Sequence, residues 1–160
     1  MNKLLVMTGL LLAVSQVPAK DGIETDAAFK AMSRIVGHWK GSIGKLVVEQ
    51  NFQTSEGGKM IVGHGHVEDV LDMESRFGWD AAAKQPYYLD MHGHDTVYYG
   101  HIRLEGDEIV TDFNGLVGDK GHYEAHAKFI TPDEYESTLY SVKDGKKTKM
   151  METIKLKRVP

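Results

Sequence analysis

Cysteine is absent from this chain of 160 residues. The protein therefore has no disulfide bonds, no thiolate chemistry and no cysteine of the kind that a bacterial lipid anchor requires. A small exported protein without disulfides depends on its hydrophobic core for stability. If this chain is exported, the lack of cysteine favours a bacterial periplasmic or secreted protein over an animal one.

Basic clusters are lacking as well. The chain carries 19 lysines and arginines against 23 aspartates and glutamates, which gives a formal net charge of −4 at pH 7. A mildly acidic protein without a basic cluster is a poor candidate for binding nucleic acid or anionic lipid. The apolar run from Leu4 to Val14 is shorter than the roughly 20 residues that cross a bilayer as a helix, so we expect no transmembrane segment.

The N-terminal segment has the three parts of a secretory signal peptide. Lys3 supplies the positive charge, Leu4 to Val14 the apolar region, and Val17-Pro18-Ala19 the small or uncharged residues that signal peptidase reads. We expect residues 1–19 to be removed, and the mature protein, residues 20–160, to be exported to the periplasm or the medium. Its length fits one domain with its own core.

Beyond a short helix, the chain has the pattern of an antiparallel sheet. Thr25-Asp26 can cap a helix in which Phe29, Met32 and Ile35 recur at helical spacing. After Gly37, turn signals recur about every dozen residues between segments rich in Val, Ile, Tyr, Phe and Thr. About ten strands without covering helices avoid exposed edges by closing on themselves. We therefore predict an all-β fold, a closed up-and-down antiparallel β-barrel with a short N-terminal lead helix.

The last two strands can be assigned inner and outer faces, because a slip of one residue turns every side chain of a strand over. A two-residue Asp144-Gly145 turn would pair Ser137 with Glu152 and Tyr135 with Ile154. The lysines of the last strand then lie outside. Glu152 is predicted to face the interior.

The segment from residue 45 to residue 54 fixes the faces of the next strands. Its inward-facing side chains are predicted to be Leu46, Val48, Gln50 and Phe52. If the following hairpin keeps this alternation, four more side chains face inward: Met60, Val62, His64 and His66. His64 would lie opposite Gln50, whereas His92 and His94 fall at a predicted hairpin tip. Gly63 and Gly65 are typical positions for a β-bulge, which would break the alternation.

The first and last strands of the predicted barrel together carry a known signature. The stretch Gly37-His38-Trp39-Lys40-Gly41 opens the first strand, and Arg158 lies on the inner face of the last. This resembles the calycin group of ligand-binding barrels, which includes lipocalins, fatty-acid-binding proteins and nitrobindin-like barrels. The resemblance implies that Trp39 packs against Arg158 and closes the barrel floor. About ten strands suit the nitrobindin-like or fatty-acid-binding variants better than the eight of lipocalins.

Within that group, Gly78-Trp79-Asp80, LEGDEIVTDF and TPDEY look like an uncharacterised family of small exported bacterial barrels. The resemblance runs from about residue 28 to residue 159. Nitrobindin-like proteins take their haem ligand from a histidine near the C-terminus, and this chain has no histidine after His126. Because haem needs an axial side-chain ligand, this departure from the nitrobindin-like pattern weakens the case for haem.

His64 and His66 are the candidate metal ligands. Two imidazoles on one face of a strand, roughly 6 to 7 Å apart at the backbone, can both reach one zinc ion. Zinc needs at least a third protein ligand, and Glu152 is about three strands away. The alternative is that both histidines form hydrogen bonds within a polar cavity. A zinc or haem-type metal at these histidines is the second interpretation of the chain.

The first interpretation is a small, largely apolar ligand inside the barrel. The predicted polar contacts are Gln50, His64, His66 and Glu152, and the predicted apolar wall is Tyr98, Met60, Met91 and Phe113. Gln50 could equally be a satisfied interior amide, and Glu152 a structural hydrogen-bonding group. No Gly-x-Ser-x-Gly motif or other activated nucleophile is recognisable. A hydrolytic enzyme with His64 as general base and Glu152 as acid is a further alternative.

Overall fold

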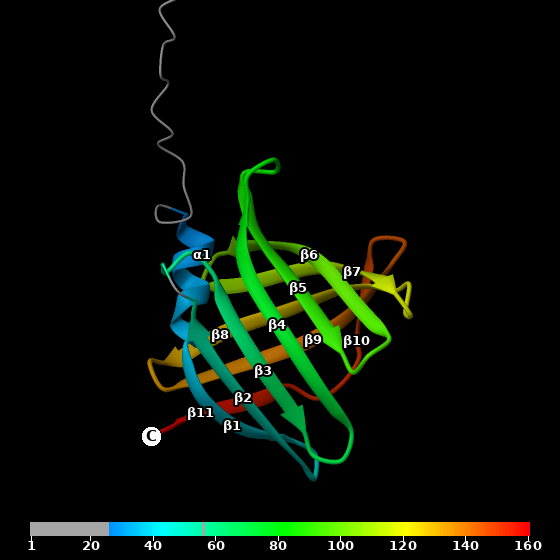
Figure 1. Ribbon diagram of the computed structural model, residues 1–160. Helices are drawn as coiled ribbons and strands as arrows, with labels where there is room; N and C mark the ends of the chain where they lie inside the picture. Colours follow the sequence, from blue (N-terminus) through cyan, green and yellow to red (C-terminus); the bar gives the residue numbers. More distant parts are fainter. Residues whose placement is uncertain (1–25, 56) are drawn as a thin grey trace, which may run out of the picture.

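The strands of this protein close into a barrel (Figure 1). The structure is a computed structural model and describes residues 26–55 and 57–160. The predicted signal peptide, residues 1–19, lies outside the described residues. Among those that are described, no helix has the length and apolar character needed to cross a membrane.

The lead helix and the strands follow one another in the predicted order. A helix, α1 (Ala27–Met32), and a 3-10 turn, η1 (Ser33–Ile35), come first. The strands are β1 (Gly37–Ile43), β2 (Leu46–Thr54), β3 (Ile61–Val67), β4 (Leu71–Asp80), β5 (Gln85–His92), β6 (Thr96–Glu105), β7 (Glu108–Val117), β8 (His122–Thr131), β9 (Glu134–Lys143), β10 (Lys146–Lys149) and β11 (Ile154–Val159).

Each strand from β1 to β9 pairs antiparallel with the next, and β11 closes the ring by pairing with both β9 and β1. The short β10 pairs with the far half of β9, on the same side as β11, so the wall has ten strand positions. The front strands cross the rear strands steeply in Figure 1. The predicted fold class, a closed up-and-down β-barrel with a lead helix, is confirmed.

The last strand differs from its predicted register. The Asp144-Gly145 turn forms as expected, and the backbone amide of Met150 still donates to the carbonyl of Leu139 over 2.9 Å. Residues 150–153 then leave the ladder, so Ser137 pairs with Ile154 instead of Glu152. The predicted inward position of Glu152 was therefore wrong. Its side chain is exposed, since it lies in the break between β10 and β11.

The register between β2 and β3 also differs from the prediction. Gln50 pairs with Gly65, and Phe52 pairs with Gly63. Because Thr54 pairs with Ile61 and not with Met60, the alternation in β3 is shifted by one, so the glycines face inward and the histidines beside them face outward. The interior has room only for glycine here, because a Cβ at residue 63 would lie 2.1 Å from the Phe52 ring.

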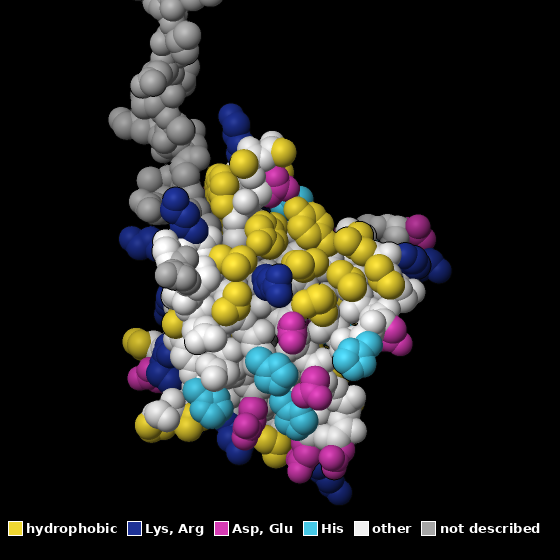
Figure 2. Space-filling view, viewed as in Figure 1, with side chains coloured by type: hydrophobic (Ala, Val, Ile, Leu, Met, Phe, Trp, Pro, Cys, Tyr) yellow, Lys and Arg dark blue, Asp and Glu magenta, His cyan; other side chains and the backbone are white. Residues whose placement is uncertain are grey.

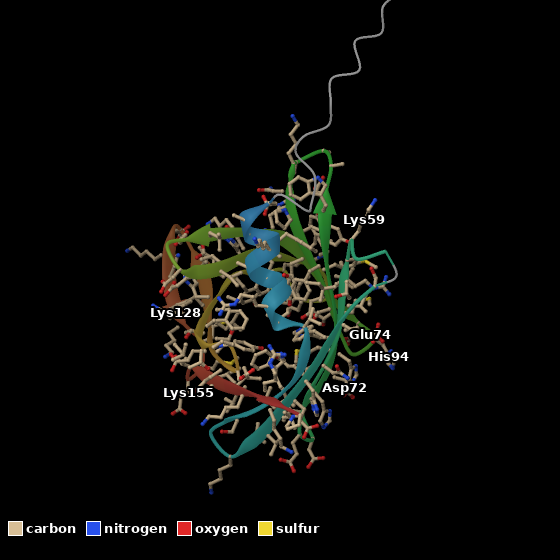
Figure 3. All side chains as sticks on the ribbon, turned by 90° about the vertical axis from the view of Figure 1, so that its left-hand side faces the viewer. Lys59, Asp72, Glu74, His94, Lys128 and Lys155 are labelled. Atoms are coloured by element: carbon tan, nitrogen blue, oxygen red, sulfur yellow. The ribbon has the colours of Figure 1, made fainter. Side chains whose placement is uncertain are left out.

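One end of the barrel is covered by the lead helix, which lies across the front in Figure 3. The Asp26 carboxylate caps it by accepting from the amide of Phe29 at 2.8 Å, and Phe29 and Met32 are buried against the barrel. Trp39 is fully buried below the helix and donates its indole N–H to the carbonyl of Ile35 over 2.6 Å. The helix thereby seals this end.

Arg158 completes that floor. Its guanidinium lies 4.2 Å from the centre of the Trp39 ring and donates to the carbonyl of Val36 at 2.7 Å. It also donates to the carboxylate of Asp133 at 2.9 Å. The Trp39 contact that the calycin resemblance implies is therefore present.

The opposite end of the barrel is less tightly closed. The turns that follow β1, β3, β5, β7 and β9 surround it. Inward side chains near this end, such as Tyr98, Tyr123 and Leu139, are only half-buried. Side chains at this end are therefore in partial contact with solvent.

Candidate ligand-binding site

The barrel interior contains a cavity of about 140 Å³ between the lead helix and the middle of the wall. Its lining residues come from the helical segment and from seven strands: Met32, Ile35, Gln50, Phe52, Gly65, Met73, Ser75, Phe77, Tyr88, Asp90, Thr111, Ala125, Ala127, Tyr135 and Ser137. Aromatic and aliphatic side chains form most of this wall, and a few polar groups interrupt it. This composition is typical of pockets that bind small organic molecules.

Small side chains keep the cavity open. Ala125, Ala127 and Ser137 lie next to one another on β8 and β9, because Ala127 pairs with Ser137 and Ala125 follows on the same face. On the opposite side of the barrel, the small residues Gly65 and Ser75 leave space in the same way. Larger side chains at these positions would fill the space, as they do in small barrels.

Gln50 lines the cavity, as predicted from its place in β2. Its side-chain oxygen accepts a hydrogen bond from the hydroxyl of Tyr135 on β9, three strand positions away around the barrel. Burial raises the pKa of Tyr135, so this hydroxyl keeps its proton and stays a donor. The interaction satisfies one end of the Gln50 amide and spans the interior.

The most deeply buried charge-bearing group of the cavity is Asp90, whose residue is 2% exposed. Its carboxylate accepts from the hydroxyl of Ser75 at 2.6 Å. The second oxygen lies 2.6 Å from Nε2 of His92, which is one step nearer the open end on the same strand. Burial, with Asp90 as the second cause, raises the pKa of Tyr88 well above its usual value. The site thus holds a carboxylate among neutral donors and one imidazole.

Asp90 and His92 were not predicted to belong to the site. His92 was placed at a hairpin tip, yet it is the last residue of β5 and faces inward. Their two-residue spacing shows that both side chains share one face of the strand. Their polar character, however, favours the solvent face, and the structure places them on the inner one. Tyr88, Asp90 and His92 face the interior, while the more apolar Leu89 and Met91 face outward.

Two predicted wall residues lie outside the barrel. Met91 faces outward because its partner on β4, Glu74, is on the outer face. Met60 precedes β3, whose first residue, Ile61, is the buried inward one. The sulfur of Met60 lies 3.7 Å from the hydroxyl of Tyr87 on that outer surface. Their prediction as interior residues was therefore wrong. That of Met60 followed the mistaken face of β3, and that of Met91 rested on its apolar character.

Tyr98 and Phe113 do face the interior, nearer the open end than the cavity. Their rings pack edge to face with centres 5.6 Å apart. The Tyr98 hydroxyl donates to Asp119 at 3.2 Å, and burial together with this carboxylate raises the pKa of Tyr98. Asp119 also accepts from Tyr123, and raises the pKa of Tyr123 to about 12. This cluster narrows the path from solvent to the cavity.

The histidines that opened the metal interpretation are outside the barrel. The side chains of His64 and His66 are 62% and 49% exposed, and their predicted inward orientation was wrong because of the register shift in β3. Nδ1 of His66 lies 2.8 Å from the carboxylate of Asp72. Asp72 and Glu74 point away from the barrel in Figure 3, and histidine and acidic side chains gather on the outer face in Figure 2.

The positions of these residues bear on both alternative interpretations. Within residues 26–55 and 57–160, no three His, Cys, Asp or Glu side chains are grouped so that they could hold a metal ion. His64 and Glu152, which the enzyme interpretation paired, both lie outside the interior. The residues that face the cavity are a different set.

Comparisons with known proteins bear on the fold alone. No protein-family model matches the sequence, and no curated protein matches it. Among solved structures, the crystal structure of Rv2717c from M. tuberculosis is similar, with a TM-score of 0.55. The two sequences are 15% identical over 84% of this chain and 99% of that one. At this identity the likeness shows a shared barrel fold and carries no function across.

Proposed function

We propose that this protein binds a small, largely apolar molecule inside its barrel. The observation that carries the proposal is the cavity of about 140 Å³, with an apolar wall and the polar groups Gln50, Asp90 and Ser137 facing it. A few converging polar groups in an apolar pocket orient a ligand and select it. The half-buried side chains at the open end support entry from that side.

The size of the cavity bounds the ligand. Pockets for drug-sized molecules measure about 300 to 1,000 Å³, so a volume of about 140 Å³ is too small for a fatty acid or a haem. An engineered apolar cavity of about 150 Å³ takes up benzene. The proposed ligand is therefore about the size of one substituted aromatic ring.

The N-terminal pattern and the calycin resemblance complete the proposal. Lys3, the apolar run from Leu4 to Val14 and Ala19 support export to the periplasm or the medium. The barrel, with Trp39 and Arg158 at its floor, supports a place among calycin-type, nitrobindin-like barrels. The protein would then bind a small molecule outside the cytoplasm.

Native mass spectrometry of the protein isolated from its own producing cells tests the proposal. We expect an organic mass that is lost on denaturation. Ala125→Leu should remove that mass, because the added carbons occupy the cavity, whereas Lys157→Leu places the same side chain on the exposed face of β11 and should retain it. An Ala125→Leu protein that is folded by circular dichroism and still carries the same mass would refute binding in this cavity.

A further inference from the structure

Within the described part of the chain, the cavity lining carries negative charge and no positive charge from lysine or arginine. Asp90 is its one carboxylate, and no lysine or arginine side chain among the described residues lines it. Barrels that bind fatty acids or other anions need a basic group inside, because an unpaired buried charge is costly. Arg158, the basic side chain at the floor, is engaged with Trp39 and with backbone carbonyls. An anionic ligand would meet only a like charge.

Asp90 has hydrogen-bond capacity left. Ser75 donates to one oxygen and His92 lies at the other, and the Tyr88 hydroxyl is a further hydrogen-bond partner of the carboxylate. A carboxylate offers about four acceptor sites, so a ligand donor can approach the same oxygens from the cavity. Among the described residues the imidazole of His92 is placed as the ion-pair partner of Asp90, and no arginine or lysine pairs with it. The carboxylate is therefore open to a cationic partner.

The rest of the wall also suits a cation. The rings of Phe52, Phe77, Tyr88 and Tyr135 line the cavity together with Asp90. Aromatic faces carry negative partial charge and attract ammonium groups, most strongly where water is excluded. Phe77 and Tyr88 pack with ring centres 5.4 Å apart, on the strands that carry Ser75 and Asp90. A ligand beside the carboxylate would thus lie against aromatic rings.

We infer that the ligand carries a protonated amine, which Asp90 receives, on a small apolar or aromatic body. This inference rests on the proposed function, because it names the chemical class of the ligand in the same cavity. The buried carboxylate selects the charge of the ligand, and the volume of about 140 Å³ selects its size. His92, at Asp90 and nearer the open end, holds the carboxylate in position.

Three probes of nearly the same shape test the sign of the charge. Benzylamine is a cation near neutral pH, benzyl alcohol is neutral and benzoate is an anion. Isothermal titration of the protein with each should show benzylamine binding about ten- to a hundredfold tighter than benzyl alcohol, from a charge-assisted hydrogen bond in place of a neutral one. Benzoate should bind more weakly than either.

A matched pair of variants locates the effect. Asp90→Asn removes the buried charge with little change in shape and should bring the affinities for benzylamine and benzyl alcohol to within about threefold of each other. Asp72→Asn makes the same change on the exposed outer face and should leave the preference for benzylamine unchanged. If Asp90→Asn fails to fold, the ratio of affinities in the unmodified protein still decides the question.

The outcomes separate this inference from the function on which it rests. If benzyl alcohol and benzylamine bind equally well, and Ala125→Leu abolishes both, the cavity binds small molecules but the cationic class is wrong. Benzoate binding at least as tightly as benzylamine would also overturn the inference. If none of the three probes binds and the protein isolated from its cells carries no organic mass, both the function and the inference fail.

Discussion

The ring of Phe52 lies against the backbone of its cross-strand partner Gly63, where a Cβ would come within 2.1 Å of the ring. We therefore expect Gly63→Ala to lower the free energy of unfolding by about 1 to 3 kcal/mol, the usual cost of overpacking. Gly65→Ala is the matched control, because its Cβ would meet the flexible end of Met73 at 2.8 Å. Urea denaturation should show the larger loss for Gly63→Ala, and an equal loss would contradict the packing described here.

Arg158 stabilises the floor through its planar guanidinium, which covers Trp39 and donates to several acceptors at once. Lysine cannot stack on the indole or reach those acceptors together. Arg158→Lys should therefore cost about 2 kcal/mol of stability, measured by urea denaturation. Lys157→Ala, next to it but exposed, should change stability by less than about 0.5 kcal/mol. A stable Arg158→Lys protein would show that the floor does not depend on the stacked contact.

The lowered pKa of the buried Glu124 carboxylate predicts how the stability of the protein changes at acid pH. Burial alone would raise its pKa, but hydrogen bonds from Lys147, His126 and Arg103 outweigh it and lower the pKa from 4.5 to about 2. A carboxylate with a lowered folded-state pKa contributes stability above its unfolded pKa, and this contribution is lost as the pH falls toward the folded value. Stability should therefore decline between about pH 5 and pH 2.

Glu124→Gln tests this directly. It should lower the free energy of unfolding at neutral pH by about 1 to 3 kcal/mol, and make the decline below about pH 5 shallower. The exposed Glu152→Gln should leave both the neutral stability and the acid slope nearly unchanged. Thermal unfolding followed by circular dichroism across this pH range measures both quantities. An acid slope identical in all three proteins would show that Glu124 is not the responsible group.

Because His64 and His66 face outward, replacing them should have no effect on binding in the cavity. Replacing His64 and His66 together by alanine should change the free energy of unfolding by less than about 1 kcal/mol, because both side chains are exposed. Benzylamine affinity should stay within about twofold, which corresponds to less than half a kcal/mol. Loss of affinity in this double variant, measured by titration calorimetry, would return these residues to the binding site.

Local chemistry was sufficient to predict the strands and most of the turns. Asp144-Gly145 forms the tight turn that its residues favour. Gly106-Asp107 likewise forms a two-residue turn, which pairs Leu104 with Ile109. Short turns transmit register reliably, because their length fixes which residues of the two strands face each other. The inward positions of Gln50 and Phe52 follow from alternation within a single strand.

The site needed more than local chemistry. Its polar residues, Asp90 and His92, lie on the side of β5 that polarity alone assigns to solvent. The Asp90 carboxylate can be buried because the hydroxyl of Ser75 on the neighbouring strand donates a hydrogen bond to it. This hydrogen bond depends on the register between β4 and β5, which places Ser75 opposite Asp90. The alternation of residues within β5 does not reveal that register.

By itself the sequence determined that this chain would form a closed antiparallel barrel with a lead helix, since alternation and turn residues act over short distances and unpaired edges favour closure. The Trp39–Arg158 floor was implied by the calycin resemblance. The tertiary structure alone decided which face of β3 and of β5 is the inner one. β3 pairs with β2 one residue away from the predicted register, and two inward glycines make room for Phe52 and Met73. A side chain's face depends on what lies across the barrel from it, and that is a property of packing.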